Sequence, residues 1–333
     1  MHEYIDLHFC FRSLTTGTTM IDIGGDGGVP FAFHGLHNGA TLKKIGVAVG
    51  GWQIKAVRAE LTDGRVGTFG RSGTFHKEFT FSPSERITEL SLWGNGVGTR
   101  LGGIRFWTSS GNKFEAYMND WGLKTEYSID VGSGVCLGLE GRFGHDIDKM
   151  GFRFINAIQS SVLTDMTYPS LAVYTPQVNK EYIKSLEYKN GTTAEEEDKF
   201  TYSRSVTKST TWSTTNKFET TFSLTVTAGI PNVAEVSAGF SLTEGAEQTS
   251  SMTKEETITE SDEVTVTVKP GKTVKVEASV GRAVIELPYS ATLKITCLNG
   301  SELQFQTTGN YNGVAYTAVT VESTESTYVK KIE

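Results

Sequence analysis

Short runs of alternating apolar and polar residues fill the first half of the chain, between Ile21 and Ala157. Glycine-rich turn sequences separate these runs, which include LKKIGVAVGG, WQIKAVRAEL, ERITELSLWG, GGIRFWTSSG, KFEAYM and GFRFI. A period of two places the apolar side chains of a strand on one face. Because no segment carries the apolar stripe of an amphipathic helix, the pattern predicts a domain built from sheets, which is a sandwich, a prism or a barrel.

The alternation becomes longer after the segment TDMTYPS, residues 164–170. It runs through KFETTFSLTVTAGI and later through DEVTVTVKPGKTVKVEASV, in a region rich in serine and threonine. Threonine is a good strand former, and its hydroxyl group tolerates a wet face. Since average strands have about 5–6 residues, the pattern predicts a second folded region with unusually long strands.

One part of this region is a candidate hairpin over residues 217–243, with a turn at Pro231–Asn232. If Ile230 lies opposite Ala234, both arms place their apolar residues on one face. The residues of that face are Phe218, Phe222, Leu224, Val226, Ala228, Ile230, Val236, Ala238, Phe240 and Leu242. In a soluble protein such a hairpin covers a core. In a membrane barrel, where a strand needs about 9–11 residues, the same face meets lipid, and the pattern leaves both uses open.

Composition and charge narrow the classes of protein to consider. The 333 residues exceed what one hydrophobic core usually serves, so we expect two domains. The net charge of −7 resides in residues 161–333, and neither half carries the basic surface that nucleic acid requires. The N-terminal residues lack the basic region and apolar core of a signal peptide. The chain therefore stays inside the cell, leaves by another route, or is shown without its leader. We expect a soluble protein that is secreted or released without an evident signal peptide.

Motifs for catalysis or metal binding are missing from the sequence. The three cysteines, Cys10, Cys136 and Cys297, are too few for a disulfide framework or a zinc site, so we expect free, mostly buried thiols. Asp146 and Asp148 are two residues apart and show no tuned acid–base partner, which argues against a pair of glycosidase carboxylates. We expect no enzyme activity, no metal and no cofactor.

Three separated blocks resemble a known family. They are IDIGGDGGVPFAFHG near the start of the first domain, RLGGIRFWTSSGNKFEAYM in its middle and GRFGHDIDKMGFRF near its end, and together they resemble the jacalin-related lectins. The resemblance implies a β-prism of three sheets over residues 21–158. It also implies a sugar site between a double-glycine loop, here Gly24–Gly28, and a G-x-x-x-D loop, here Gly144–Asp148.

The same resemblance assigns roles to the residues of these two loops. Backbone N–H groups of Gly28, His145 and Asp146 would donate to sugar hydroxyls, and the Asp148 carboxylate would accept two hydroxyl protons. Two complete loops of this kind resemble the mannose-binding members of the family, although His145–Asp146 stands where an aromatic residue often sits. The expected site residues are Gly27, Gly28, Gly144, His145, Asp146 and Asp148.

The second region resembles the aerolysin-type pore-forming module. The resemblance rests on SVTKSTTWSTTNKFETTFSLTVTAGIPNVAEVSAGFSLTEG and on TITESDEVTVTVKPGKTVKVEASVGRAVIELPYSATL. Within it, the stretch from Thr265 to Val274 is expected to form a strand pair with its turn. As a whole the chain looks most like the natterin-like proteins of fish, which place a jacalin-type lectin before such a module. The resemblance implies an all-β protein, in which an elongated β-sheet module over residues 163–333 follows the lectin domain.

Together the two resemblances imply a protein that binds mannose-type glycans on a cell surface and then oligomerises. Each copy would contribute its hairpin to a transmembrane β-barrel, because a single hairpin leaves backbone groups unsatisfied in lipid. The expected partners are mannose-type glycans, membrane lipid after assembly, and further copies of the chain, a soluble dimer before assembly included. The alternative is a non-inserting lectin whose C-terminal module is a dimerisation or stalk domain. Residues 1–20 receive no role.

Overall fold

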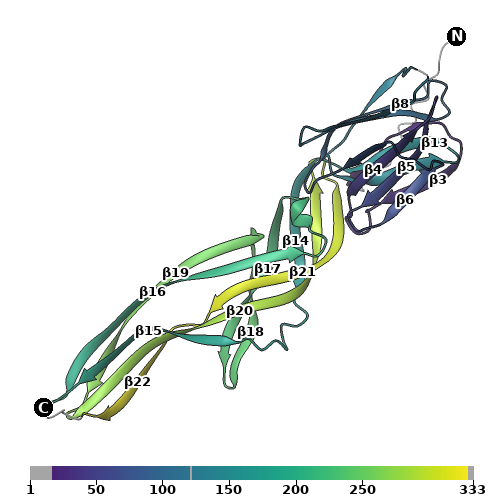
Figure 1. Ribbon diagram of the computed structural model, residues 1–333. Coiled ribbons are helices and arrows are strands. Elements are labelled where there is room, and N and C mark those ends of the chain that lie inside the picture. The colour runs from purple at the N-terminus through teal and green to yellow at the C-terminus, as the bar shows by residue number, and fades with distance from the viewer. Residues whose placement is uncertain (1–16, 121, 329–333) are drawn as a thin grey trace. The chain divides into compact units, whose positions relative to one another are not determined.

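The computed structural model describes residues 17–120 and 122–328, and within these ranges the protein is all-β. Strands β1 to β22 are accompanied by one 3-10 turn, η1 (Phe218–Thr220) (Figure 1). This confirms the all-β prediction. Residues 1–16 of the N-terminal segment lie outside the described ranges, whereas Thr18–Thr19 forms strand β1 and pairs with β13 (Ile147–Ile155).

Two compact units make up the chain. Unit 1 combines the residues through Thr164 with Thr214–Leu224 and Ala291–Thr307. Unit 2 comprises Asp165–Ser213, Thr225–Ser290 and the residues from Thr308 onward. The first unit therefore contains the predicted lectin region together with two stretches from the second half of the sequence.

Unit 1 is built around three antiparallel sheets (Figure 1). The first runs in the order β1 (Thr18–Thr19), β13 (Ile147–Ile155), β12 (Cys136–Phe143), β3 (Val29–His34), and β2 (Asp22–Gly24) also pairs with β13. The second runs in the order β10 (Lys113–Tyr117), β9 (Leu101–Thr108), β8 (Ile87–Gly94), β11 (Glu126–Ile129). The third runs in the order β6 (Val66–Gly70), β5 (Ile54–Leu61), β4 (Leu42–Val49), β7 (Lys77–Thr80).

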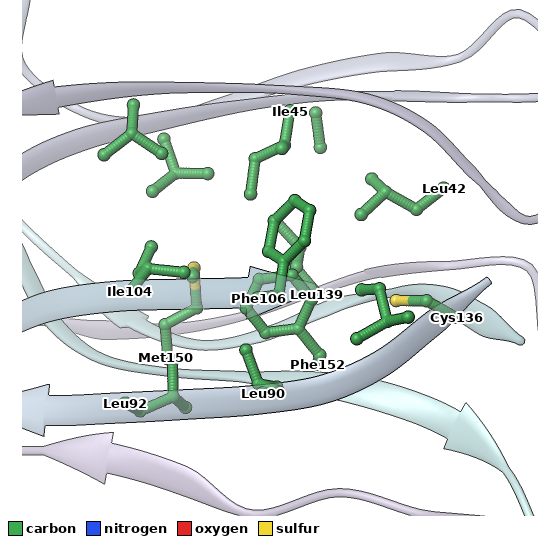
Figure 2. Packing of buried hydrophobic residues seen from close by; sticks show 14 of the residues in the cluster. Leu42, Ile45, Leu90, Leu92, Ile104, Phe106, Cys136, Leu139, Met150 and Phe152 are labelled. Carbon is green, nitrogen blue, oxygen red and sulfur yellow. The ribbon is translucent and has the colours of Figure 1, made fainter. Parts of the chain in front are cut away.

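The three sheets share one hydrophobic core, which the alternation of the sequence produces. Leu90 and Leu92 on β8, and Ile104 and Phe106 on β9, are each two residues apart and at most 2% exposed. Figure 2 shows them gathered with side chains from the other two sheets. Each fully buried side chain of this size stabilises the fold by about 1.5–3 kcal/mol. Three sheets closed around one core form a β-prism, as expected.

The fourth sheet has nine strands, several of them long. Strand β20 has 26 residues and β16 has 19, which confirms the prediction of unusually long strands. The order is β18 (Gly239–Ser251), β17 (Leu224–Val236), β14 (Ile158–Thr167), β20 (Lys272–Cys297), β21 (Glu302–Tyr316), β16 (Glu196–Thr214), β19 (Thr253–Val268) (Figure 1). Two further strands pair with β20, namely β15 (Val178–Lys189) and β22 (Thr320–Thr327).

The serine- and threonine-rich strands of unit 2 have one wet face and one dry face. On the wet face the hydroxyl oxygens of Ser205 and Thr259 lie 2.7 Å apart across β16 and β19, and those of Thr207 and Thr257 lie 3.2 Å apart. The dry face holds a core in which Phe200 is fully buried. Cross-strand hydroxyl pairs stabilise a sheet, so the composition is compatible with a folded region, as predicted.

The predicted hairpin turn at Pro231–Asn232 is wrong. Strand β17 continues through both residues and pairs with β18 up to Val236 opposite Gly239, so the turn lies at residues 237–238. The register shifts between Gly229 and Pro231, which marks a bulge. A proline is tolerated there because a bulge does not require its missing N–H group in the ladder.

The observed register also changes which residues share a face. Val226 lies opposite Ser250 and Ala228 opposite Gln248, whereas the prediction placed them opposite Ala238 and Val236. At these two positions apolar residues of one arm face polar residues of the other, whereas Val233 lies opposite Leu242. The stretch expected to form a strand pair with its turn, Thr265 to Val274, contains the end of β19 and the start of β20, but these two strands do not pair with each other. Strand β19 pairs with β16, whereas β20 pairs with β14, β21, β15 and β22.

Candidate functional site

The double-glycine loop lies between β2 and β3, and it meets the buried carboxylate of Asp148 on β13. Asp148 is 4% exposed. A Cβ atom on Gly27 would lie 2.5 Å from Asp148 Oδ1, and one on Gly28 would lie 2.6 Å from Oδ2. Gly28 also has a φ of +70°, which side chains rarely adopt. Glycine at both positions therefore lets the carboxylate lie directly against the loop backbone.

Side chains from the first sheet fasten this loop. Arg142 on β12 donates from Nε to the Gly27 carbonyl at 3.0 Å and from Nη2 to the Gly28 carbonyl at 2.8 Å. Lys149 on β13 donates to Asp26 Oδ1 at 2.7 Å, and this hydrogen bond lowers the pKa of Asp26. A loop held at several points needs little further ordering when a ligand binds.

Arg100 joins the two aspartates of the G-x-x-x-D loop. It lies in the loop between β8 and β9, and its Nη1 is 3.1 Å from Asp148 Oδ1 while its Nε is 3.4 Å from Asp146 Oδ2. Sequence reasoning missed this residue, which is 46 positions away from Asp146. The guanidinium group holds the Asp148 carboxylate in place and leaves Oδ2 beside the glycine loop.

The side chain of Asp146 is buried and connects the G-x-x-x-D loop to residues of β5 and of the turn before it. Its side chain is nine-tenths buried, and Oδ1 accepts a hydrogen bond from Gln53 Nε2 at 3.1 Å with Lys55 Nζ at 3.7 Å. His145 is exposed, and its backbone carbonyl accepts a hydrogen bond from Arg71 N at 2.9 Å. The turn is closed by Gly144 N, which donates to the Asp146 carbonyl at 3.0 Å.

An aromatic ring lies at the edge of this cluster. Trp52, in the turn between β4 and β5, is 38% exposed, and Arg100 Cζ is 5.7 Å from its ring centroid. Sequence reasoning placed no aromatic residue here, because the position expected for one is occupied by His145 and Asp146. The signal available in the sequence was a tryptophan directly after the glycine pair Gly50–Gly51 at the end of a predicted strand.

The residues expected on the hairpin face lie in three places: at η1, in the turn, and in the two strands β17 and β18. Phe218 lies in η1 and Phe222 just after it, both at most 4% exposed, so neither belongs to the hairpin strands. Ala238 lies in the turn, and Val236 at the end of β17 is 45% exposed. The others lie within the two strands: Leu224, Val226, Ala228 and Ile230 on β17, and Phe240 and Leu242 on β18.

Two of the three cysteines lie within the described ranges. Cys136 and Cys297 are free and buried, as expected, and burial raises the pKa of Cys136 to about 12. The expectation for Cys10 concerns a residue outside the described ranges. Among the described residues, His, Cys, Asp and Glu form no group of three or more that could hold a metal ion, and no helix is long and apolar enough to cross a membrane.

Comparison with known proteins identifies the class of the first unit and the family of the chain. Residues 21–153 match the Jacalin-like lectin domain. The crystal structure of lamprey immune protein is 54% identical in sequence, with a TM-score of 0.91, and the match covers 94% of this chain and 100% of that one. The chain therefore belongs to the family of lamprey immune protein, and it carries a jacalin-like lectin domain.

Two plant lectins are similar to part of this chain. Malaysian banana lectin is 23% identical with a TM-score of 0.35, over 42% of this chain and 99% of that one. A mannose-binding jacalin-related lectin from Ananas comosus is 22% identical with a TM-score of 0.34, over 41% of this chain and 97% of that one. A comparison with curated proteins found no match.

Proposed function

We propose that the protein binds mannose-type glycans at Asp148 and that its second unit then inserts a hairpin into the target membrane. The observation that carries the first part is the Asp148 carboxylate, which Arg100 holds against the backbone of Gly27 and Gly28. Adjacent hydroxyls of a sugar need a fixed acceptor with backbone donors close by, and charged acceptors make the strongest of these hydrogen bonds. The resemblance of both loops to mannose-binding lectins supports the class of sugar.

Replacing Asp148 by asparagine tests the sugar site. The change keeps the shape, leaves one neutral acceptor oxygen and replaces the other by an NH2 donor. At least one charge-assisted hydrogen bond of about 1.5–3 kcal/mol is lost, so affinity for methyl α-mannoside falls at least tenfold. Isothermal titration calorimetry measures this. The matched control is Asp130→Asn, which removes the charge of an exposed aspartate directly after β11 and leaves the affinity within a fewfold. Full affinity in a folded Asp148→Asn variant contradicts the assignment.

The proposed membrane insertion is supported by the position of the hairpin in its sheet. Strand β18 ends the strand order, and β17 is joined on its other side to β14 alone. The hairpin can therefore leave the sheet by breaking one strand pairing. Several copies must associate before insertion, since unpaired strand edges are not tolerated in lipid. The chain is soluble before this step, acts at the target membrane afterwards, and performs no catalysis.

A lipid-facing surface requires the hairpin to pair differently from the register described above. Apolar residues of both arms share one face only if the turn moves to Pro231–Asn232, as the parity of the sequence permits. Insertion therefore includes a change of register between β17 and β18. The free energy for that change comes from burying the apolar face in lipid.

A disulfide across the hairpin tests this step. The hydroxyl oxygens of Thr227 and Thr249 lie 2.9 Å apart on β17 and β18, so a cysteine pair there locks the present register when oxidised. Dye release from mannoside-bearing vesicles should then be lost and should return on reduction. The control pair replaces Ser205 and Thr259, which are 2.7 Å apart on β16 and β19, and it keeps dye release in both states.

The alternative of a non-inserting lectin makes a different prediction for the same vesicles. Wild-type protein would bind them through Asp148 and cause no dye release at any protein concentration. The second unit would then serve only to join copies or to extend the lectin. Binding without release by the reduced, unmodified protein would contradict the pore-forming part and leave the sugar site intact.

A further inference from the structure

A cavity of about 580 Å³ lies within unit 1, at the ends of the strands that are opposite to the sugar loops. Strand β4 shows this arrangement, because its first residue, Leu42, lines the cavity, whereas its last residue, Val49, leads into the turn that contains Trp52. Pockets that hold a small molecule have volumes of about 300–1,000 Å³. The cavity is therefore large enough for a ligand, and it is separate from the loops around Asp148.

The wall of the cavity is apolar on its buried side and polar at its rim. The residues of the buried side are each at most 6% exposed, and they are Ala40, Leu42, Ile87, Val135, Cys136 and Phe218. The rim includes the exposed residues Ser84, Asn216 and Lys217. An apolar wall with a polar rim favours an amphiphile, because its chain leaves water while its headgroup stays beside polar groups.

Two carboxylates at the cavity are already supplied with hydrogen-bond donors. Asp63 Oδ2 accepts a hydrogen bond from Arg65 Nε at 2.7 Å. Glu85 accepts one from Asn112 Nδ2 at 2.8 Å and another from the backbone N of Ser82 at 2.9 Å. Because the charge of both carboxylates is met within the protein, the cavity has no need of a cationic ligand.

Two cations at the cavity, Arg86 and Lys217, form no ion pair with a carboxylate among the described residues. Arg86 Nη2 donates to the Thr221 carbonyl at 2.6 Å, and Nη1 donates to the Ser133 carbonyl at 3.4 Å. Burial lowers the pKa of Arg86. A guanidinium group carries five N–H donors, so several remain available to a ligand. The charges at the cavity therefore favour an anion.

We propose that this cavity binds a fatty acid, with its carboxylate at Arg86 and its single alkyl chain along the apolar wall. A carboxylate pairs with a guanidinium group through two parallel hydrogen bonds, and arginine is more weakly hydrated than lysine. The chain adds affinity as well, because each methylene group that leaves water strengthens binding about fourfold. The fatty-acid site is independent of the sugar site and goes beyond the proposed function.

Calorimetry on the wild type tests the chemistry of the occupant. Decanoate, kept below the concentration at which it forms micelles, should bind about tenfold more tightly than octanoate, because its chain buries two more methylene groups. Decyltrimethylammonium has the same chain with a positive headgroup, and it should bind at least tenfold more weakly than decanoate. Saturating methyl α-mannoside should leave the affinity for decanoate unchanged.

A variant of Arg86 tests where the carboxylate lies. Arg86→Gln should lower the affinity for decanoate at least tenfold, because the charge-assisted hydrogen bonds are lost. The matched control is Arg58→Gln, since Arg58 is an exposed arginine on β5 outside the cavity, and it should keep the wild-type affinity. Circular dichroism establishes that both variants fold, and the comparison of ligands on the wild type needs no variant.

The outcomes separate this proposal from the sugar site. A wild type that does not bind decanoate, or that binds decyltrimethylammonium equally well, overturns the fatty-acid site. Full affinity for decanoate in a folded Arg86→Gln variant also overturns it. Competition between decanoate and methyl α-mannoside would place the amphiphile at the sugar loops and overturn it as well. Each of these results leaves the assignment of Asp148 to be decided by mannoside affinity alone.

Discussion

Replacing Phe218 by alanine asks whether this residue belongs to a core or to a membrane hairpin. In unit 1 the ring is 2% exposed, with the Phe222 ring centroid at 5.8 Å and that of Phe305 at 6.1 Å. A Cβ atom on Gly39 would lie 2.6 Å from the Phe218 ring, so the two are in close contact. We expect the variant to destabilise the soluble fold.

The size of the loss follows from the packing around the ring. Truncation of a buried phenylalanine to alanine usually lowers the free energy of unfolding by about 3–5 kcal/mol. Phe218 also lines a cavity of about 580 Å³ within unit 1, so the space that truncation leaves joins a cavity that already exists. The loss should therefore lie at the lower end of that range, about 3 kcal/mol.

Urea denaturation and trypsin digestion both measure the effect. Lys217, directly before the ring, is exposed, so loosening of η1 should speed cleavage after this lysine. Val236→Ala, at a residue that is 45% exposed, is the control and should change the free energy of unfolding by less than about 0.5 kcal/mol. A loss below 1 kcal/mol in Phe218→Ala, with unchanged cleavage, would refute the placement of Phe218 in the core.

Three further changes have definite expected outcomes. Gly28→Ala forces an alanine to φ +70° and against the Phe143 carbonyl and Asp148 Oδ2, so calorimetry should show mannoside affinity at least tenfold weaker. Burial raises the pKa of Tyr168 to about 12, so the unfolded chain loses this phenol proton first, near pH 10. The free energy of unfolding should therefore fall between pH 10 and 12, and fall less in Tyr168→Phe, as followed by denaturation at each pH. Val226→Arg places a charge at a fully buried position, so thermal denaturation should show a loss of several kcal/mol before any membrane is present. An unchanged affinity, pH profile or melting temperature, respectively, would contradict each expectation.

The alternation of apolar and polar residues was sufficient to predict those features of the fold that depend on a single strand. The alternation of Leu90, Leu92, Ile104 and Phe106 predicts which side chains are buried, because successive side chains of a strand point to opposite faces. The same holds for the long threonine-rich strands. The glycine loop and Asp148 could also be predicted, since they are short motifs whose chemistry requires those residue types at that spacing.

Pairing between distant segments was decided only by the tertiary structure. Arg100, Gln53 and Trp52 come from two other loops, and nothing in their local sequence marks them as neighbours of Asp146 and Asp148. Such contacts arise when three sheets close around one core, and they depend on which loops that closure brings to the same end. The pattern of residues along one segment carries no information about which distant loops will lie beside it.

The register of the hairpin formed by β17 and β18 also could not be predicted from the sequence. A turn at Pro231–Asn232 and a turn at residues 237–238 both leave the alternation along β17 intact, because the alternation within one strand does not depend on the register of its partner. The choice is made by the bulge at Gly229–Pro231 and by the packing of Val226 and Ala228 into a buried face. Alternation determines which residues share a face along a strand, whereas burial against the rest of the fold determines the register in which strands pair.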